Sequence, residues 1–124
     1  MSEIPEHLQY TAEHEWVATA GDVATVGITA AAATQLGDLV FIQLPEIGAR
    51  VTAGQVCGEV ESTKSVSDLY SPVTGSVAEI NEVAVSDPAV VNADPYGDGW
   101  LIRVTVEEAG SLLSAAEYRA LTGE

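Results

Sequence analysis

The chain has 124 residues, of which 47% are hydrophobic, and it carries a formal net charge of −15. This length fits one domain over residues 1–124, and the hydrophobic content is too high for a disordered chain. Such an acidic surface repels the phosphates of nucleic acids and of anionic membranes, so we exclude both as partners. The acidic side chains either attract proteins with basic patches or only keep the chain in solution, and both interpretations stay open.

The chain has one cysteine, Cys57, so no disulfide can form within it. The N-terminal residues resemble neither a secretory signal nor an Arg-rich transit peptide, and no apolar run is long enough to span a bilayer. We therefore expect a cytoplasmic, monomeric protein. A removed organelle transit peptide is the open alternative.

Short apolar stretches separated by turn residues predict a mainly β protein. Gly21-Asp22 predicts a hairpin between the first two strands, and residues 72–75 (Pro-Val-Thr-Gly) predict a turn before the sixth. Apolar and other residues alternate strictly in the last strand. The expected strands cover residues 16–20, 23–28, 39–44, 55–61, 67–71, 76–80 and 100–106.

Two helices are expected at the margins of this β framework. The Ala-rich segment 29–36 ends at Gly37, a residue that commonly terminates a helix. A second helix is expected at about 111–122, where Ser114-Ala115-Ala116-Glu117 has the spacing of a capping box. Tyr118 and Leu121, three residues apart, are expected to share its apolar face.

Lys64 is the one lysine of the chain. Small polar residues surround it in Glu61-Ser62-Thr63-Lys64-Ser65, and strand-like runs flank this segment, which predicts an exposed turn. A lysine at such a tip presents a single amine on a flexible stem, as the attachment point of an acyl group requires. By composition alone, an acidic chain that happens to retain one lysine is the favoured explanation.

Six stretches of the chain, in this order, carry motifs typical of one known family: Tyr10–Trp16, Val23–Thr29, Leu36–Phe41, Leu44–Gly48, Gly58–Gly75 around Lys64, and Asp94–Ile102. On these residues the chain resembles the H protein of the glycine cleavage system. The resemblance implies a lipoyl-domain-like flattened β-sandwich, also called a barrel-sandwich hybrid or hammerhead, with lipoate bound covalently to Lys64.

Related carriers differ from this pattern. Biotin domains usually present Met-Lys-Met, whereas Thr63 and Ser65 flank this lysine. Lipoyl domains of 2-oxo acid dehydrogenases often have Asp-Lys-Ala, and they lack both the Glu-His-Glu-Trp region and the C-terminal helix. The resemblance therefore favours lipoate over biotin and an H protein over a dehydrogenase domain.

The resemblance also implies a function as a non-catalytic carrier. In the family, the lipoyl arm takes an aminomethyl group from the P-protein (glycine decarboxylase) to the T-protein (aminomethyltransferase), and the L-protein (dihydrolipoamide dehydrogenase) reoxidises it. Attachment requires a lipoate ligase, or an octanoyltransferase with lipoyl synthase. Two alternatives stay open: a lipoyl-relay protein that serves 2-oxo acid dehydrogenases, and an unmodified acidic interaction module.

The family protects the loaded arm in a surface cleft, where a cationic amine requires a carboxylate partner. Carried over by position, the candidates are Glu15 and Asp68, with Glu13 nearby. Gln35 stands where some members have histidine. No other chemistry is supported, because Cys57 lacks the local motif of a thiol nucleophile and the histidines lack a metal-ligand spacing.

Overall fold

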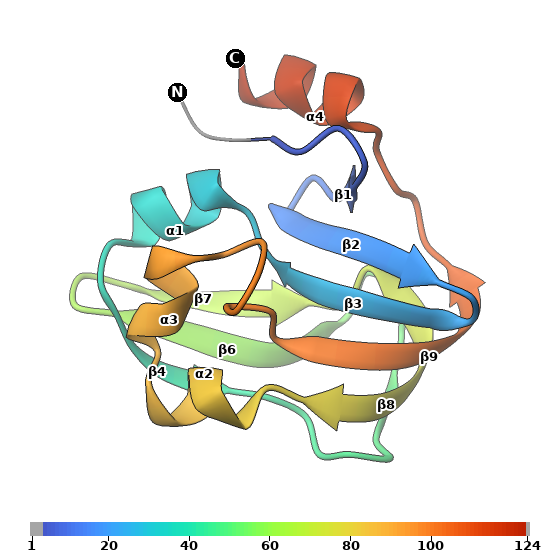
Figure 1. The fold of residues 1–124 in the computed structure, drawn as a ribbon, viewed down its shortest axis with the longest axis horizontal. Coiled ribbons are helices and arrows are strands. Elements are labelled where there is room, and N and C mark those ends of the chain that lie inside the picture. The colour runs from blue at the N-terminus through green and yellow to red at the C-terminus, as the bar shows by residue number, and fades with distance from the viewer. Residues whose placement is uncertain (1–3, 124) are drawn as a thin grey trace.

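The computed structural model of the chain describes residues 4–123. Its strands form two antiparallel sheets that pack against each other, as Figure 1 shows. The larger sheet has the strand order β1-β2-β3-β9-β8-β5 and the smaller one β4-β6-β7. The predicted flattened β-sandwich is therefore confirmed. The strands are β1 Gln9–Tyr10, β2 Glu15–Ala20, β3 Val23–Ile28, β4 Leu39–Gln43, β5 Arg50–Val51, β6 Val56–Ser62, β7 Val66–Tyr70, β8 Val73–Ile80 and β9 Ile102–Ala109.

The predicted turn at residues 72–75 is wrong beyond its first residue, because β8 already begins at Val73. Long-range pairing with β9 overrides the local turn preference, and the ladder accommodates it with an irregularity between Thr74 and Gly75. The last strand is also displaced, since it starts at Ile102 and continues to Ala109.

Two helices match the expectation and two were missed. Helix α1 (Ala30–Leu36) begins after Thr29, whose side chain accepts a hydrogen bond from the amide of Ala32, and ends at Gly37. The helices α2 (Glu82–Ser86) and α3 (Ala89–Ala93) have five residues each and are too short to show a helical period. None of the helices among residues 4–123 is long and apolar enough to cross a membrane.

Helix α4 (Ala115–Thr122) begins later than the predicted residue 111. Leu113 instead pairs with Tyr10 through reciprocal backbone hydrogen bonds of 2.8 and 2.7 Å, which holds the chain extended up to Ser114. The predicted capping box then starts the helix, because Ser114 and Glu117 each bond the other's backbone amide.

The apolar face of α4 differs from the prediction. Tyr118 is fully buried, but Leu121 is 53% exposed, so these two residues do not share a buried face. Ala115 is the second buried residue of the helix. The helix packs against the N-terminal segment, so the first and last parts of residues 4–123 lie on the same side of the molecule (Figure 1).

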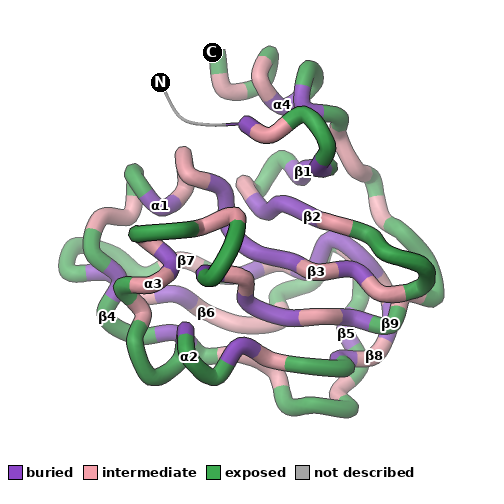
Figure 2. The backbone as a smooth tube through the Cα atoms, viewed as in Figure 1, coloured by how far each residue is buried: buried purple, intermediate pink, exposed green. Residues whose placement is uncertain are grey.

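The core consists of two clusters. Aliphatic side chains fill the space between the two sheets, and a smaller aromatic cluster lies between β1, β2 and α4. Figure 2 shows this burial along the central strands, with exposed backbone at the β6–β7 turn. The fold thus provides a rigid frame from which that turn projects. The smaller cluster contains Ile4, Leu8, Tyr10, Trp16, Ala115 and Tyr118.

Candidate functional site

The β6–β7 turn is organised by the side chain of Ser62. Its hydroxyl oxygen accepts hydrogen bonds from the amides of Lys64 at 3.2 Å and Ser65 at 3.1 Å. The amide of Thr63 donates to the carbonyl of Asp38 at 3.1 Å, which ties the turn to the segment between α1 and β4. The predicted exposed turn is present, with Lys64 at its tip.

The stem of Lys64 lies across Gly37. A Cβ atom added to Gly37 would be 3.3 Å from Cε of Lys64 and 3.8 Å from its Nζ. Gly37 ends α1 with a φ of 83°, a backbone conformation that favours glycine, and the lysine stem lies close to its Cα hydrogens. The lysine is therefore exposed at the C-terminal end of α1.

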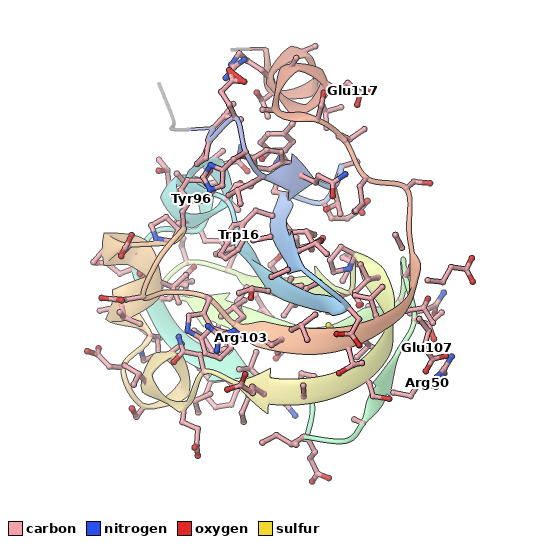
Figure 3. The ribbon with its side chains drawn as sticks, turned by 45° about the vertical axis from the view of Figure 1, so that its right-hand side comes forward. Trp16, Arg50, Tyr96, Arg103, Glu107 and Glu117 are labelled. Carbon is pink, nitrogen blue, oxygen red and sulfur yellow. The ribbon has the colours of Figure 1, made fainter. Side chains whose placement is uncertain are left out.

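The cationic side chains of the chain differ in their partners. Arg50, Arg103 and Arg119 each form an ion pair with a glutamate, and Figure 3 shows Arg50 beside Glu107. Within residues 4–123, no ion pair involves Lys64. In this part of the chain the lysine amine is thus not held by a carboxylate, whereas the three guanidinium groups are paired.

Helix α1 separates two surface hollows. The first, here called the arm hollow, has a volume of about 310 Å³ and lies between α1 and the β6–β7 turn. Its lining residues are Glu13, His14, Ala32, Gln35, Leu36, Ser65, Val66 and Ser67. The second, here called the α1–α3 hollow, has a volume of about 320 Å³ and is lined by Ala30, Ala33, Thr34, Gly37, Asp38, Asn92 and Pro95.

The arm hollow brings together two of the four predicted cleft residues, Glu13 and Gln35. Asp68 is exposed on β7 and is not among the residues that line either hollow. The preceding residues of β7, Val66 and Ser67, do line the arm hollow.

Glu15 is buried, with an exposed fraction of 2%, and it also lines neither hollow. The Thr11 hydroxyl donates to its Oε1 at 2.6 Å, and the Tyr70 amide donates to its Oε2 at 3.2 Å. Burial raises the pKa of Glu15 from 4.5 to about 7, because the charged form loses its hydration. The carboxyl group therefore joins β2 to β7 beneath the surface.

His14 is a wall residue of the arm hollow that sequence reasoning did not select. It has a φ of 69°, uncommon for a residue with a side chain, and its Nδ1 lies 2.6 Å from the Tyr118 hydroxyl. That hydroxyl is also 2.8 Å from Oγ1 of Thr29. The partners are separated by 104 and 89 residues, so no local pattern could have indicated this network.

Cys57 packs against the main core cluster. Burial raises the pKa of its thiol to about 12, and the neighbouring carboxyl group of Glu15 contributes in the same direction. A thiol in this environment stays protonated and is a poor nucleophile. This environment agrees with the absence of a thiol-nucleophile motif around Cys57.

Comparisons with known proteins support the same family as the sequence motifs. The family model described as "Glycine cleavage H-protein" matches residues 8–124. The glycine cleavage system H protein of Beutenbergia cavernae is 62% identical over 119 residues, covering 96% of each chain. That of Streptomyces coelicolor is 58% identical over 121 residues, covering 96% of this chain and 97% of the relative.

A solved structure supports the fold as well. The crystal structure of a glycine cleavage system H protein from Mycobacterium marinum superposes with a TM-score of 0.94 at 51% sequence identity. The match covers 98% of this chain and 100% of the other. An exposed lysine on a hairpin tip, a hollow beside it and similarity along nearly the whole chain lead to one conclusion: the protein belongs to the glycine cleavage H-protein family.

Proposed function

We propose that this chain is an aminomethyl carrier for glycine cleavage and that lipoate is bound covalently to Lys64. The observation that carries the proposal is the position of Lys64, exposed and without an ion pair in the described part of the chain, on a turn beside the arm hollow. When bound, the dithiolane supplies the redox and group-transfer chemistry. The protein contributes attachment, orientation and shelter, and it catalyses no reaction itself.

The residues of the turn fit such an attachment. Ser62 and the Thr63–Asp38 hydrogen bond hold the backbone, while the lysine stem remains exposed above Gly37. Extended, the lysine and a lipoyl chain reach more than ~10 Å by bond-length arithmetic. This reach is sufficient for one arm to enter the adjacent hollow or to extend to the active site of a partner.

The arm hollow offers a carboxylate for a cationic amine. Glu13 lines it from the loop before β2, and Gln35 lines it from α1. A carboxylate stabilises an ammonium group by a charge-assisted hydrogen bond, and the wall of α1 limits access of water. We assign Glu13 and Gln35 to the wall of the loaded arm's resting place. Glu15 supports that wall from the interior, and a role for Asp68 rests on its position in the sequence alone.

The proposal includes the partners of the reaction cycle. The P-protein loads the arm, the T-protein unloads it and the L-protein reoxidises it, after a ligase or an octanoyltransferase with lipoyl synthase has modified Lys64. Basic docking patches on these enzymes would complement the net charge of −15. Residues 1–124 act as one carrier domain in this proposal.

Two measurements, made one after the other, test this function. Intact and peptide mass spectrometry of protein from a lipoate-replete host should find a lipoyl adduct on Lys64, and Lys64→Arg should abolish it. The lipoylated protein should then support glycine–bicarbonate exchange by the P-protein. Lipoylation without exchange would favour the lipoyl-relay alternative, and persistent absence of an adduct would favour an unmodified interaction module.

A further inference from the structure

Asn92, on α3, binds the segment that connects α1 to β4. Its Oδ1 accepts a hydrogen bond from the amide of Leu39 at 2.9 Å, and its Nδ2 donates to the carbonyl of Gly37 at 2.9 Å. One side-chain amide thus satisfies a backbone donor and a backbone acceptor two residues apart. The Asn92 amide hydrogen-bonds to the backbone as a residue of a neighbouring strand would, and these bonds fix the conformation of residues 37–39.

The opposite side of the same segment supports the acceptor turn. The carbonyl of Asp38, between the two residues that Asn92 binds, accepts the hydrogen bond from the amide of Thr63 at 3.1 Å. Gly37 forms the surface against which the stem of Lys64 lies. Residues 37–39 therefore lie between Asn92 and the turn, and Asn92 holds the segment that makes these two contacts with Thr63 and Lys64.

We propose that Asn92 is a positioning residue for the acylation of Lys64, an inference that rests on the proposed function. An acylating enzyme must bring the lysine amine to about 3–3.5 Å from the acyl carbon, and a small misplacement can reduce the rate by about a hundredfold. Without Asn92, residues 37–39 lose two hydrogen bonds, and both the Thr63 anchor and the surface beneath the lysine stem shift. The amine remains exposed and chemically reactive but is presented in varying positions.

The chain offers a matched control in Asn81. Its Nδ2 donates to the carbonyls of Asp98 at 2.8 Å and Trp100 at 2.7 Å, so this asparagine also makes two backbone contacts. Neither carbonyl belongs to the segment that touches the Lys64 turn. Asn81→Ala should therefore destabilise the fold without changing the presentation of Lys64.

The experiment compares unmodified wild type, Asn92→Ala, Asn92→Asp and Asn81→Ala with purified lipoate ligase, ATP and lipoate, well below the melting temperature of each. Asn92→Asp retains the acceptor for the Leu39 amide but removes the donor to the Gly37 carbonyl. If Asn92→Ala does not fold, Asn92→Asp is the variant that tests the inference. Acetylation of Lys64 by a small acetylating reagent, followed on the Lys64 peptide, reports the reactivity of the amine without an enzyme. Amide hydrogen exchange at Thr63 reports its hydrogen bond.

We expect kcat/KM of the ligase to fall about tenfold or more for both Asn92 variants, with faster exchange at Thr63 and an unchanged rate of chemical acetylation. Asn81→Ala should match wild type in all three measurements. Wild-type kcat/KM in both Asn92 variants, or an equal loss in Asn81→Ala, would overturn the inference. If the ligase fails to acylate Lys64 of the wild type, the proposed function fails, and this inference fails with it.

Discussion

The hydroxyl of Tyr118 lies 2.6 Å from Nδ1 of His14, which joins the C-terminal helix to the wall of the arm hollow. The same hydroxyl is 2.8 Å from Oγ1 of Thr29, the residue that caps α1. One oxygen atom therefore contacts segments on two sides of the hollow. The C-terminal helix supports the site in addition to covering the second core cluster.

Removal of this hydroxyl should affect both the fold and the arm. Tyr118→Phe keeps the aromatic stacking on Tyr10 but removes the partner of His14 Nδ1 and one of the two partners of Thr29 Oγ1, so we expect the free energy of unfolding to fall by about 1–3 kcal/mol. We also expect faster hydrolysis of the loaded aminomethyl group, because the His14 wall becomes mobile. Urea unfolding and the decay of loaded protein, isolated from its partners, measure the two effects.

Tyr10 supplies the control for this prediction. Its ring stacks on that of Tyr118 with centroids 4.7 Å apart, but its hydroxyl donates to the carbonyl of Pro5, away from the hollow. Tyr10→Phe should therefore lower stability without shortening the lifetime of the loaded arm. Equal lifetimes in the two variants would show that the hydroxyl of Tyr118 has no special relation to the hollow.

Glu15 should make the stability of the protein depend on pH. Its pKa is about 7 in the folded state and about 4.5 in the unfolded chain, so the folded state binds more protons between these values. Stability should therefore fall as pH rises through this range. A pKa shift of this size lowers the free energy of unfolding by about 3 kcal/mol. This loss of stability is absent below pH ~4.5 and complete above pH ~7.

Glu15→Gln isolates this contribution from that of the other carboxylates. The glutamine oxygen can accept from the Tyr70 amide while its NH₂ group donates to the Thr11 hydroxyl, so the packing is retained. Urea unfolding between pH 4.5 and 7.5 should show the stability of wild type decreasing relative to that of the variant. A constant difference across this range would contradict the assignment.

The two hollows beside α1 allow the resting place of the loaded arm to be tested with adjacent residues. Gln35 lines the arm hollow and Thr34 lines the α1–α3 hollow, and both are exposed on the helix. Gln35→Trp should fill the arm hollow and accelerate hydrolysis of the loaded group, whereas Thr34→Trp should leave the rate unchanged. If instead Thr34→Trp accelerates hydrolysis and Gln35→Trp does not, the loaded arm rests in the α1–α3 hollow.

Gly37 should be required for presentation of Lys64 as well as for the backbone. Gly37→Ala places a side chain at a φ of 83° and a ψ of −158°, which costs about 1–3 kcal/mol, and it adds a contact of 3.3 Å to Cε of Lys64. Gly48→Ala is the control, because Gly48 has a φ of 90° but open space around its Cβ position. Both variants should lose stability, and only Gly37→Ala should slow lipoylation by purified ligase.

The parts of the fold that sequence analysis predicted correctly depend on local interactions. The β2–β3 hairpin follows from Gly21-Asp22, the start and end of α1 from Thr29 and Gly37, and the start of α4 from the Ser114 capping box. The two-residue strands β1 and β5 have no local pattern of their own. They exist because longer neighbouring strands provide hydrogen-bond partners.

The candidate site also contains residues that local sequence indicates and residues whose role depends on distant contacts. Composition and the neighbouring residues make Lys64 a plausible acceptor, and the family resemblance that names its acyl group rests on motifs of the sequence, so no distant contact is needed to find it. The burial of Glu15 and the contacts of Asn92 depend on partners 55 and 53 residues away in the sequence. A carboxylate on an open cleft and one buried between two sheets have the same appearance in the sequence, because only the tertiary fold determines their hydration.

In the proposed function, the lipoyl arm on Lys64 carries the aminomethyl group of glycine. The most direct test incubates the lipoylated protein with the P-protein and glycine labelled at its α-carbon, and then maps the label by peptide mass spectrometry. We expect labelled carbon on the lipoylated Lys64 peptide, in an amount that depends on glycine. A lipoylated Lys64 peptide that gains no label under conditions where the P-protein loads a known H protein would contradict it.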